Sequence, residues 1–429
     1  MTMLKLYFLL VLSLWAGTHL SAQMTLEECV ALAQDNYPLI RKYDLLTQTK
    51  EVNLSDINKS WLPQISLYGQ GTVQNETPSF PQSLARLISQ TGTPVSGLNE
   101  WQYKIGADIS QNIWDGGAAQ SRRKIEHAED AERQAALEVQ LYAIRERVEN
   151  LYFGILLIEE QVKQTRNMQG LLQSNLDKLR AMQKNGTALQ SDADMVEAQC
   201  LNTAQQLTQA ESTAESYRKV LEIFIGKSLA GQKLLKPETS IPQDLMPDRP
   251  ELKHFEARLM ANDAQNASIN SSIMPQIGLF AQAYYGYPGL DYFESMMNRD
   301  LSFNLLAGVK VSWNIGAFYT KKNHRQKLRL ASENIAVERD VFLFNTRMKV
   351  RSQLDHIHEL KAVMKEDGRI VTLRENVRKA AESQLDNGVI DATALLTKLT
   401  DEKQARLATA YHEIQLLQSI YQLKYTLNK

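Results

Sequence analysis

Hydrophobic and polar residues alternate one by one over residues 103–113. Tyr103, Ile105, Ala107, Ile109 and Ile113 fall on one side of this pattern, and Lys104, Gly106, Asp108, Ser110 and Asn112 fall on the other. Successive side chains of a β-strand point to opposite faces. The segment is therefore predicted to be a strand with one apolar face and one polar face.

The period changes directly after this strand. Beyond Gly116 and Gly117, apolar residues recur at alternating steps of three and four: Leu141, Ile144, Val148, Leu151, Ile155, Ile158 and Val162. This spacing predicts a coiled-coil helix. A helix that continues to the Asn185-Gly186 pair would have roughly 68 residues and a length of about 100 Å. A returning helix with the same spacing follows the pair, so the segment is expected to form a helical hairpin.

The same plan occurs twice along the chain. Trp61-Leu62-Pro63-Gln64-Ile65 is matched by Ile273-Met274-Pro275-Gln276-Ile277, and each proline ends a polar helix before a strand begins. Strands are expected at about 65–73 and 103–113, and again at about 277–285 and 305–315. Helical hairpins are expected at about 118–226 and 320–428. The repeat offset settles at about 202, which pairs Asn112 with Asn314 and Gly186 with Gly388.

The N-terminus predicts export. Lys5 precedes an apolar run that ends at Trp15, and the small residues Ser21 and Ala22 follow. A run of about ten residues is too short to span a bilayer and is typical of a secretory signal peptide. The predicted organisation is a signal peptide at 1–22, a first repeat at 23–235, a proline-rich linker at 236–250 and a second repeat at 251–429.

Composition excludes several classes of function. The net charge of −1 gives no basic field that would suggest nucleic acid. Cys29 and Cys200 are expected to be separate thiols. His356 and His358 are two positions apart on a predicted helix and so point to different sides, which does not suit a metal ion. We therefore expect no enzymatic activity, no cofactor and no metal.

The four strands have the length of tilted membrane strands. Four strands cannot close a barrel, and an open sheet edge is not tolerated in lipid, so several chains would have to share one barrel. Two copies would supply eight strands and three copies would supply twelve. The alternative is a soluble hairpin pair on a periplasmic coiled-coil protein without a pore.

In its order of motifs the chain resembles the TolC family of outer-membrane efflux channels. In the first half the motifs are the strand that begins at Leu62-Pro63-Gln64-Ile65, the turn Trp114-Asp115-Gly116-Gly117, the hairpin tip at 183–194, and the end of the returning helix at Ile223-Phe224-Ile225-Gly226. The second half repeats this order from Arg249-Pro250-Glu251-Leu252 and has its own tip at 384–395. The resemblance covers essentially the whole mature chain. It implies a mainly helical fold with long coiled-coil hairpins, and a homotrimer in which four strands per chain form a shared 12-stranded barrel.

The resemblance also implies partners and a location. The protein would lie in outer-membrane lipid, extend into the periplasm, and meet a periplasmic adaptor and an inner-membrane transporter of the RND or ABC type. By position, the adaptor-docking residues are Asn185, Gly186 and Thr187 at the first tip, and Asn387, Gly388 and Val389 at the second. The glycines are equally explained by a turn that needs positive φ. The strand-helix turns would contain Pro63, Gly116, Gly117, Pro275 and Gly316.

The sequence departs from the family at the periplasmic entrance. The acidic positions of well-studied members correspond to Ala394 and Thr397 here. Four carboxylates stand nearby: Asp192, Asp194, Asp386 and Asp391. A ring of any of them around a three-fold axis would favour cations or a gated opening, because the like charges repel one another. A solvated charge near a helix end is the simpler interpretation of each.

The predicted function is the passive exit duct of a tripartite efflux pump that exports small molecules. An exit duct for type I protein secretion differs only in its cargo. A periplasmic coiled-coil protein with no channel is the competing class.

Overall fold

The structure is a computed structural model that describes residues 23–92, 95 and 97–429. The signal peptide expected at 1–22 lies outside the described residues. The described chain divides into two units. One unit contains the described residues up to Tyr43 together with Ala135–His254 and Glu338–Lys429. The other contains Asp44–Gln134 and Phe255–Val337.

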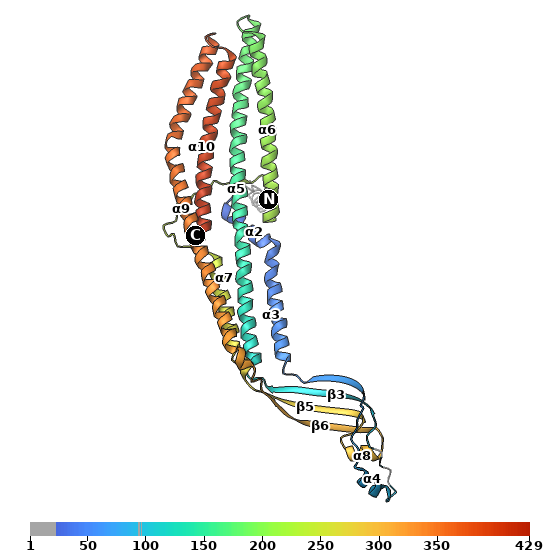
Figure 1. Cartoon of the computed structure of the whole chain (residues 1–429). Coiled ribbons are helices and arrows are strands. Elements are labelled where there is room, and N and C mark those ends of the chain that lie inside the picture. The colour runs from blue at the N-terminus through green and yellow to red at the C-terminus, as the bar shows by residue number, and fades with distance from the viewer. Residues whose placement is uncertain (1–22, 93–94, 96) are drawn as a thin grey trace, which may run out of the picture. The chain divides into compact units, whose positions relative to one another are not determined.

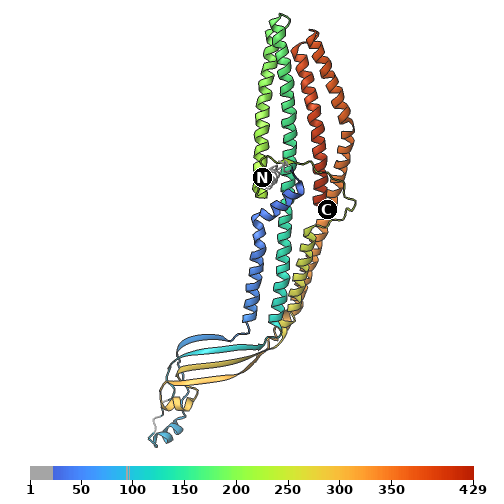
Figure 2. The ribbon, with the colours of Figure 1, turned by 180° about the vertical axis from the view of Figure 1, so that it is seen from behind.

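Two long helical hairpins form most of the first unit, as the apolar spacing predicts, and the first turns of their long helices belong to the second unit. Helix α5 (Ala118–Lys184, 67 residues) is followed by α6 (Gln190–Ile225), and α9 (Ala317–Asp386, 70 residues) is followed by α10 (Ala392–Leu427). Figures 1 and 2 show α6 beside α5 and α10 beside α9. Helix α9 begins three residues before the expected start at Thr320.

The repeat offset is not constant from the strands onward, which corrects the expected pairing of Asn112 with Asn314. Asn112 lies within β3 (Trp101–Trp114), whereas Asn314 lies beyond the end of β6 (Ser302–Ser312) and just before α9. The two long helices end at equivalent residues but differ in length by three residues. The change in offset therefore falls between the strand and the tip.

Four strands form one antiparallel sheet in the second unit. Its order is β2 (Gln64–Val73), β3, β5 (Gln276–Tyr287) and β6. Strands β3 and β5 come from different repeats and pair at the centre, which leaves β2 and β6 at the edges. Figures 1 and 2 show the strands side by side in a single layer.

Two strands end differently from expectation. Strand β6 ends at Ser312, before the expected residue 315, because the Trp313 indole N–H donates to the Ile273 carbonyl at 2.9 Å and the chain turns into α9. In β3, the register with β5 shifts between Asn112 and Trp114, so Ile113 falls in a β-bulge.

The connections within each strand pair are not simple loops. Residues 75–99 contain α4 (Gln82–Ser89), and the second connection contains α8 (Tyr292–Met297). Leu98, Tyr287 and Met296 form a small buried cluster there, with Phe80 packed against it. Serine, proline and glycine in these segments favoured a loop prediction and concealed both helices.

Shorter helices precede each pair of strands. Helix α2 (Leu26–Asn36) begins with a capping box: the Glu28 N–H donates to Thr25 Oγ1 at 3.2 Å, and the Thr25 N–H donates to Glu28 Oε2 at 3.0 Å. A 3₁₀ turn (Pro38–Arg41) leads into α3 (Lys42–Lys59). Helix α7 (Pro250–Ser268) and a 3₁₀ turn (Ser271–Ile273) occupy the same place in the second repeat.

The middle of α5 carries the buried core of the first unit. Strand β1 (Gln23–Met24) pairs in parallel with β4 (Lys233–Leu234), and the Tyr152 hydroxyl of α5 lies 2.9 Å from the Met24 carbonyl oxygen. The linker after β4 is held to the C-terminal end of α10. Its Asp248 N–H donates to the Leu427 carbonyl at 2.9 Å, and Asn428 Nδ2 donates to the Asp248 carbonyl at 2.7 Å.

Candidate functional site

The sheet has one apolar face that is exposed on every strand, which we call the apolar face. The register places residues such as Ile65 opposite Ile109 and Leu279 opposite Val309. Its exposed large members are Ile65, Leu67, Val73, Trp101, Tyr103, Ile105, Ile109, Leu279, Tyr285, Phe303, Leu305, Val309 and Val311. Leu67 is 83% exposed. An apolar surface of this extent on a water-soluble sheet would be unusual.

The opposite face carries the charged residues of the sheet. Lys104 Nζ lies 5.7 Å from the centre of the Tyr68 ring and 5.4 Å from that of Tyr284, so the cation is held between two aromatic rings. Gln282 Nε2 donates to Asp108 Oδ1 at 2.7 Å across the β3–β5 pair. The sequence pattern predicted the two faces, but the placement of Lys104 between tyrosines depends on three strands and could not be predicted.

Both edges of this sheet are open in the single chain. Strand β2 pairs only with β3, and β6 pairs only with β5, among the strands that the structure describes. The backbone groups on the outer sides of β2 and β6 therefore lack strand partners. An edge of ten or more residues with an exposed apolar face is a template for pairing with another chain.

The two hairpin tips have the same backbone turn. Gly186 has φ of +76° and Gly388 has φ of +70°, the left-handed region that glycine adopts without strain. The Thr187 N–H donates to the Met182 carbonyl at 2.9 Å, and the Val389 N–H donates to the Gln384 carbonyl at 2.8 Å. Each helix thus ends in a Schellman motif. The expected docking residues all lie in these turns.

The four acids near the tips all have partners within the chain. Asp391 caps α10, because its carboxylate accepts the Ala394 N–H at 2.8 Å. Asp386 forms an ion pair with Lys178 at 3.1 Å. Asp194 accepts from Gln190 Nε2 at 2.6 Å, and Asp192 lies 3.4 Å from the Leu189 backbone nitrogen. An entrance role for any of them stays a prediction.

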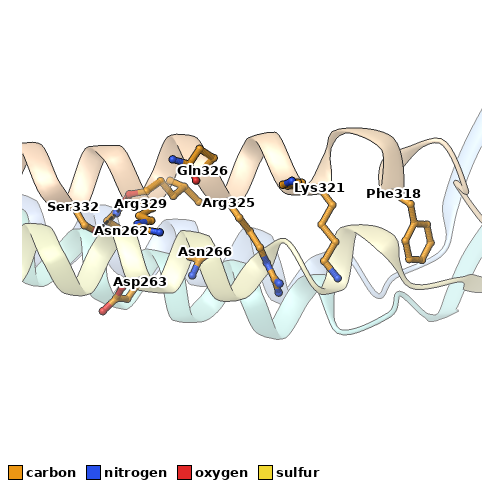
Figure 3. A pocket seen from close by; sticks show the side chains of 11 residues that line it. Asn262, Asp263, Asn266, Phe318, Lys321, Arg325, Gln326, Arg329 and Ser332 are labelled. Carbon is orange, nitrogen blue, oxygen red and sulfur yellow. Dashed lines mark hydrogen bonds between the residues drawn. The ribbon is translucent and has the colours of Figure 1, made fainter.

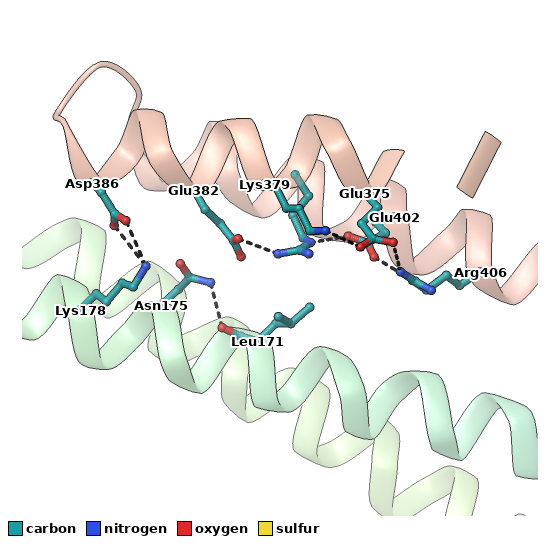
Figure 4. Close-up of polar contacts among 10 residues, drawn as sticks. Leu171, Asn175, Lys178, Glu375, Lys379, Glu382, Asp386, Glu402 and Arg406 are labelled. Carbon is teal, nitrogen blue, oxygen red and sulfur yellow. Dashed lines mark hydrogen bonds and ion pairs between the residues drawn. The ribbon is translucent and has the colours of Figure 1, made fainter. Parts of the chain in front are cut away.

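A buried ion network lies just behind the second tip, and sequence reasoning missed it. Arg378 contacts Glu402 and also Glu382, at 2.6 Å from the latter, and Arg406 lies 2.7 Å from Glu402. Arg378 and Glu402 are both buried. Figure 4 shows Glu382, Glu402 and Arg406 of this network, with the Lys178–Asp386 pair nearer the tip. Charged residues at steps of three and four look like a solvated helix face, so no sequence signal distinguished them.

A second buried acid lies on α5. Glu149 is 2% exposed; one carboxylate oxygen lies 2.8 Å from Arg145 Nε. Its other oxygen has no hydrogen-bond partner among the described residues. Burial raises the pKa of Glu149 from its ordinary value of 4.5 to about 7, although Arg145 acts in the opposite direction.

The strand-helix turns differ between the repeats. Gly116 and Gly117 have φ of +69° and +85°, and the Asp115 carboxylate accepts the Gly117 and Ala118 N–H groups. A Cβ on Gly116 would lie 2.5 Å from Met274 Cβ, which explains why no larger residue fits. Gly316 does not have a positive φ, so that turn does not require glycine. Pro63 and Pro275 stand directly before β2 and β5.

Within the described residues, no helix combines the length and apolar character that a membrane span requires. No three described His, Cys, Asp or Glu side chains come close enough together to hold a metal ion.

No protein-family model and no curated protein matches the sequence. Solved structures do match the fold over most of the chain. The outer membrane protein VceC of Vibrio cholerae has a TM-score of 0.67 at 12% identity, over 94% of this chain and 95% of its own. The CmeC outer membrane channel of Campylobacter jejuni has a TM-score of 0.64 at 15% identity, over 94% and 85%. The MtrE outer membrane channel of Neisseria gonorrhoeae has a TM-score of 0.63 at 13% identity, over 94% and 88%.

The chain has the TolC-like outer-membrane channel fold. The matched structures named here are an outer-membrane protein and two outer-membrane channels, not enzymes. The expected fold class, long helical hairpins with four strands, is confirmed.

Proposed function

We propose that the chain forms an outer-membrane channel that serves as the passive exit duct of a tripartite efflux pump. The observation that carries the proposal is the sheet, which has an apolar face, a polar face and two open edges. In a closed barrel the apolar face would contact lipid, the polar face would line the lumen, and β6 of one chain would pair with β2 of the next.

Three copies would form the 12-stranded barrel. The helices also favour assembly of several copies, because α9 exposes an apolar stripe in the single chain. The stripe consists of Val341, Phe344, Met348, Val363, Ile370, Leu373 and Val377. Helix α5 instead buries Val148, Ile155 and Leu172. An exposed stripe with coiled-coil spacing suits a neighbouring helix.

The two tips are the proposed docking sites for a periplasmic adaptor. Asn185, Thr187, Asn387 and Val389 flank rigid Schellman turns, and Val389 is 70% exposed. Rigid, exposed turns suit recognition, because little conformational entropy is lost on binding. An RND or ABC transporter in the inner membrane would supply the energy, and small molecules are the proposed cargo.

One pair of variants tests the channel directly. Leu67 and Ser66 are neighbours on β2 and point to opposite faces of the sheet. Leu67→Arg would place a charge in lipid, at a cost of about 2–4 kcal/mol near the bilayer midplane. We expect this variant to lose the outer-membrane trimer, measured by detergent size-exclusion chromatography with light scattering. Ser66→Arg should retain the trimer and change its conductance in planar bilayers.

Each result has a clear meaning. A wild-type monomer released from envelopes without detergent would overturn the channel proposal and favour the periplasmic coiled-coil alternative. Equal tolerance of both substitutions would show that the apolar face does not contact lipid. Accumulation of an exported protein, rather than of a small toxic compound, in a deletion strain would favour the secretion duct.

A further inference from the structure

An open cavity of about 670 Å³ lies between α7 and the start of α9 in the second unit. Asn262, Asp263 and Asn266 of α7 form one wall, and Lys321, Lys322 and Arg325 of α9 form the other. Figure 3 shows Lys321 and Arg325 of α9 beside α7, with Phe318 at the start of α9. The volume lies within the range of small-molecule sites.

The cavity is strongly basic. Lys321 and Lys322 have no ion pair among the described residues, and Asp263 is the one acid among the described residues that line the cavity. Arg325 Nη2 donates to the neutral Asn270 side chain at 2.8 Å and so retains its net charge. The cavity therefore presents several positive charges that the chain itself does not neutralise.

The walls of the cavity are held in place by a buried amide. Asn262 is 8% exposed, and its Nδ2 lies 2.7 Å from the Leu328 carbonyl oxygen and 2.6 Å from Ser332 Oγ. These contacts join α7 to α9 at the cavity. Its basic side chains are thus displayed from a fixed framework.

The apolar face of the sheet reaches the rim of the cavity. Trp313 is the first residue after β6 and is 55% exposed. Its ring packs edge-on against Phe318 with 6.3 Å between ring centroids. Tryptophan beside basic residues is typical of the boundary between lipid and water.

The same level of the unit is basic on other helices. Lys59 ends α3, and Arg122, Arg123 and Lys124 lie in the first turns of α5. The acids nearby are Asp56 of α3, Asp115, which caps α5, and Glu126 and Glu129 of α5, which both pair with Arg133. A belt of positive charge next to an apolar sheet attracts anionic lipid headgroups.

We propose that this cavity binds the headgroup of an anionic phospholipid in the membrane leaflet that meets the helical end of the sheet. The phosphate would accept hydrogen bonds from Lys321, Lys322 and Arg325, the headgroup hydroxyls would face Asn266 and Asp263, and the acyl chains would follow Phe318 and Trp313 onto the apolar face. The proposal rests on the membrane location in the proposed function.

The test uses the detergent-solubilised wild-type assembly and native mass spectrometry with phosphatidylglycerol or phosphatidylcholine added. We expect preferential retention of phosphatidylglycerol. The double variant Lys321→Gln/Lys322→Gln should weaken this binding roughly 30-fold, since each basic group near an anionic surface contributes about a factor of five. Arg325→Gln should also weaken it.

The matched control is Lys361→Gln/Lys365→Gln, which removes two exposed charges farther along the same helix. This variant should retain phosphatidylglycerol at the wild-type level. Equal retention of the two lipids, or equal losses in both double variants, would overturn the proposal. Full competition by inorganic phosphate at millimolar concentration would identify a free-phosphate site instead.

The result is separable from the proposed function. An outer-membrane trimer without lipid preference would remove only the headgroup site. A soluble monomer would remove the channel, and with it the lipid as occupant.

Discussion

The two hairpins end in the same turn but are packed differently just behind it. Leu176 lies ten residues before Gly186 and Arg378 lies ten residues before Gly388, while Cys200 and Glu402 lie fourteen residues after the same glycines. In the first hairpin these positions are apolar: Leu176 is in a buried cluster and Cys200 packs against that cluster. In the second they are an arginine and a glutamate in contact.

This difference shows that the same hairpin backbone can be packed with either an apolar pair or an ion pair at equivalent positions. A buried apolar pair is stable through packing alone, whereas a buried ion pair must offset the loss of hydration of both charges. The second hairpin adds Glu382 and Arg406 to the pair, which satisfies more of the charged atoms. The presence of the buried ion network does not by itself show that it stabilises the hairpin. We expect the effect of removing one charged residue to depend on whether its partners are still present.

The largest expected effect comes from breaking the network at one residue. Arg378→Leu leaves the buried Glu402 with Arg406 as its remaining cation and removes a contact of Glu382, so we expect a loss of up to about 3–5 kcal/mol in the free energy of unfolding. Leu176→Ala, a cavity in the equivalent place, should cost about 2–5 kcal/mol. Denaturant unfolding followed by circular dichroism measures both.

The control converts the second hairpin into the first. Arg378→Leu/Glu402→Cys reproduces the apolar pair, and Arg406 keeps Glu375 at 2.8 Å as a partner. We expect this double variant to recover most of the stability lost in Arg378→Leu. A double variant as unstable as the single one would show that the network itself is required, and that the loss in Arg378→Leu does not come from Glu402 having lost one of its two cations.

The long helices differ in the same way farther from the tips, and here the difference depends on pH. In the Arg145–Glu149 pair of α5 the carboxylate is buried, whereas both members of the Arg351–Asp355 pair of α9 are exposed. Since the pKa of Glu149 is raised to about 7, the folded protein holds a proton that the unfolded chain releases above pH 4.5. Stability should fall as the pH rises from 4.5 to 7, by up to ~3 kcal/mol, and then level off.

Glu149→Gln tests this by removing the titrating group while keeping the shape. The melting temperature of the variant should lose the part of the decline between pH 5 and 7 that the wild type shows. Asp355→Asn is the exposed counterpart and should leave the decline unchanged. An unchanged slope in Glu149→Gln would show that Glu149 is not the group that causes the decline.

Local periodicity explains how much of the fold could be predicted from the sequence. Ile105 and Leu67 alternate with polar residues, and Val148 and Ile155 recur at helical steps. The strands and long helices could therefore be predicted from residues that are close together in the sequence. Helix α4 was missed because Pro81 and the surrounding small residues favour turns. The β3 bulge at Ile113 was missed because it depends on pairing with β5.

The site was less predictable for the same physical reason. The tip glycines could be found because a single backbone turn requires them. The environments of Asp386 and Asp391 could not be predicted. Asp386 forms an ion pair with Lys178 and Asp391 caps a helix, but the sequence shows each of them only as an acidic residue near a tip. Arg378, Lys104 and Glu149 depend on residues distant in sequence or on burial, which a single sequence does not display.

The smallest expected effect concerns the first residue after each tip turn. Asp391 caps α10 through the Ala394 N–H, whereas the equivalent position before α6 is Leu189, whose side chain has no oxygen to accept a hydrogen bond. Asp391→Ala should therefore cost about 1 kcal/mol of stability. Leu189→Asp should gain up to about 1 kcal/mol, because it supplies the missing cap to α6.

Exchanging the two caps gives this comparison its sharpest form. A chain with Leu189→Asp and Asp391→Leu carries one capped helix, as the wild type does, but on the other hairpin. We expect its stability to match the wild type within about 0.5 kcal/mol if capping alone distinguishes the tips, because distant substitutions add independently. A larger loss would mean that the Asp391 carboxylate makes a stabilising contact beyond the cap.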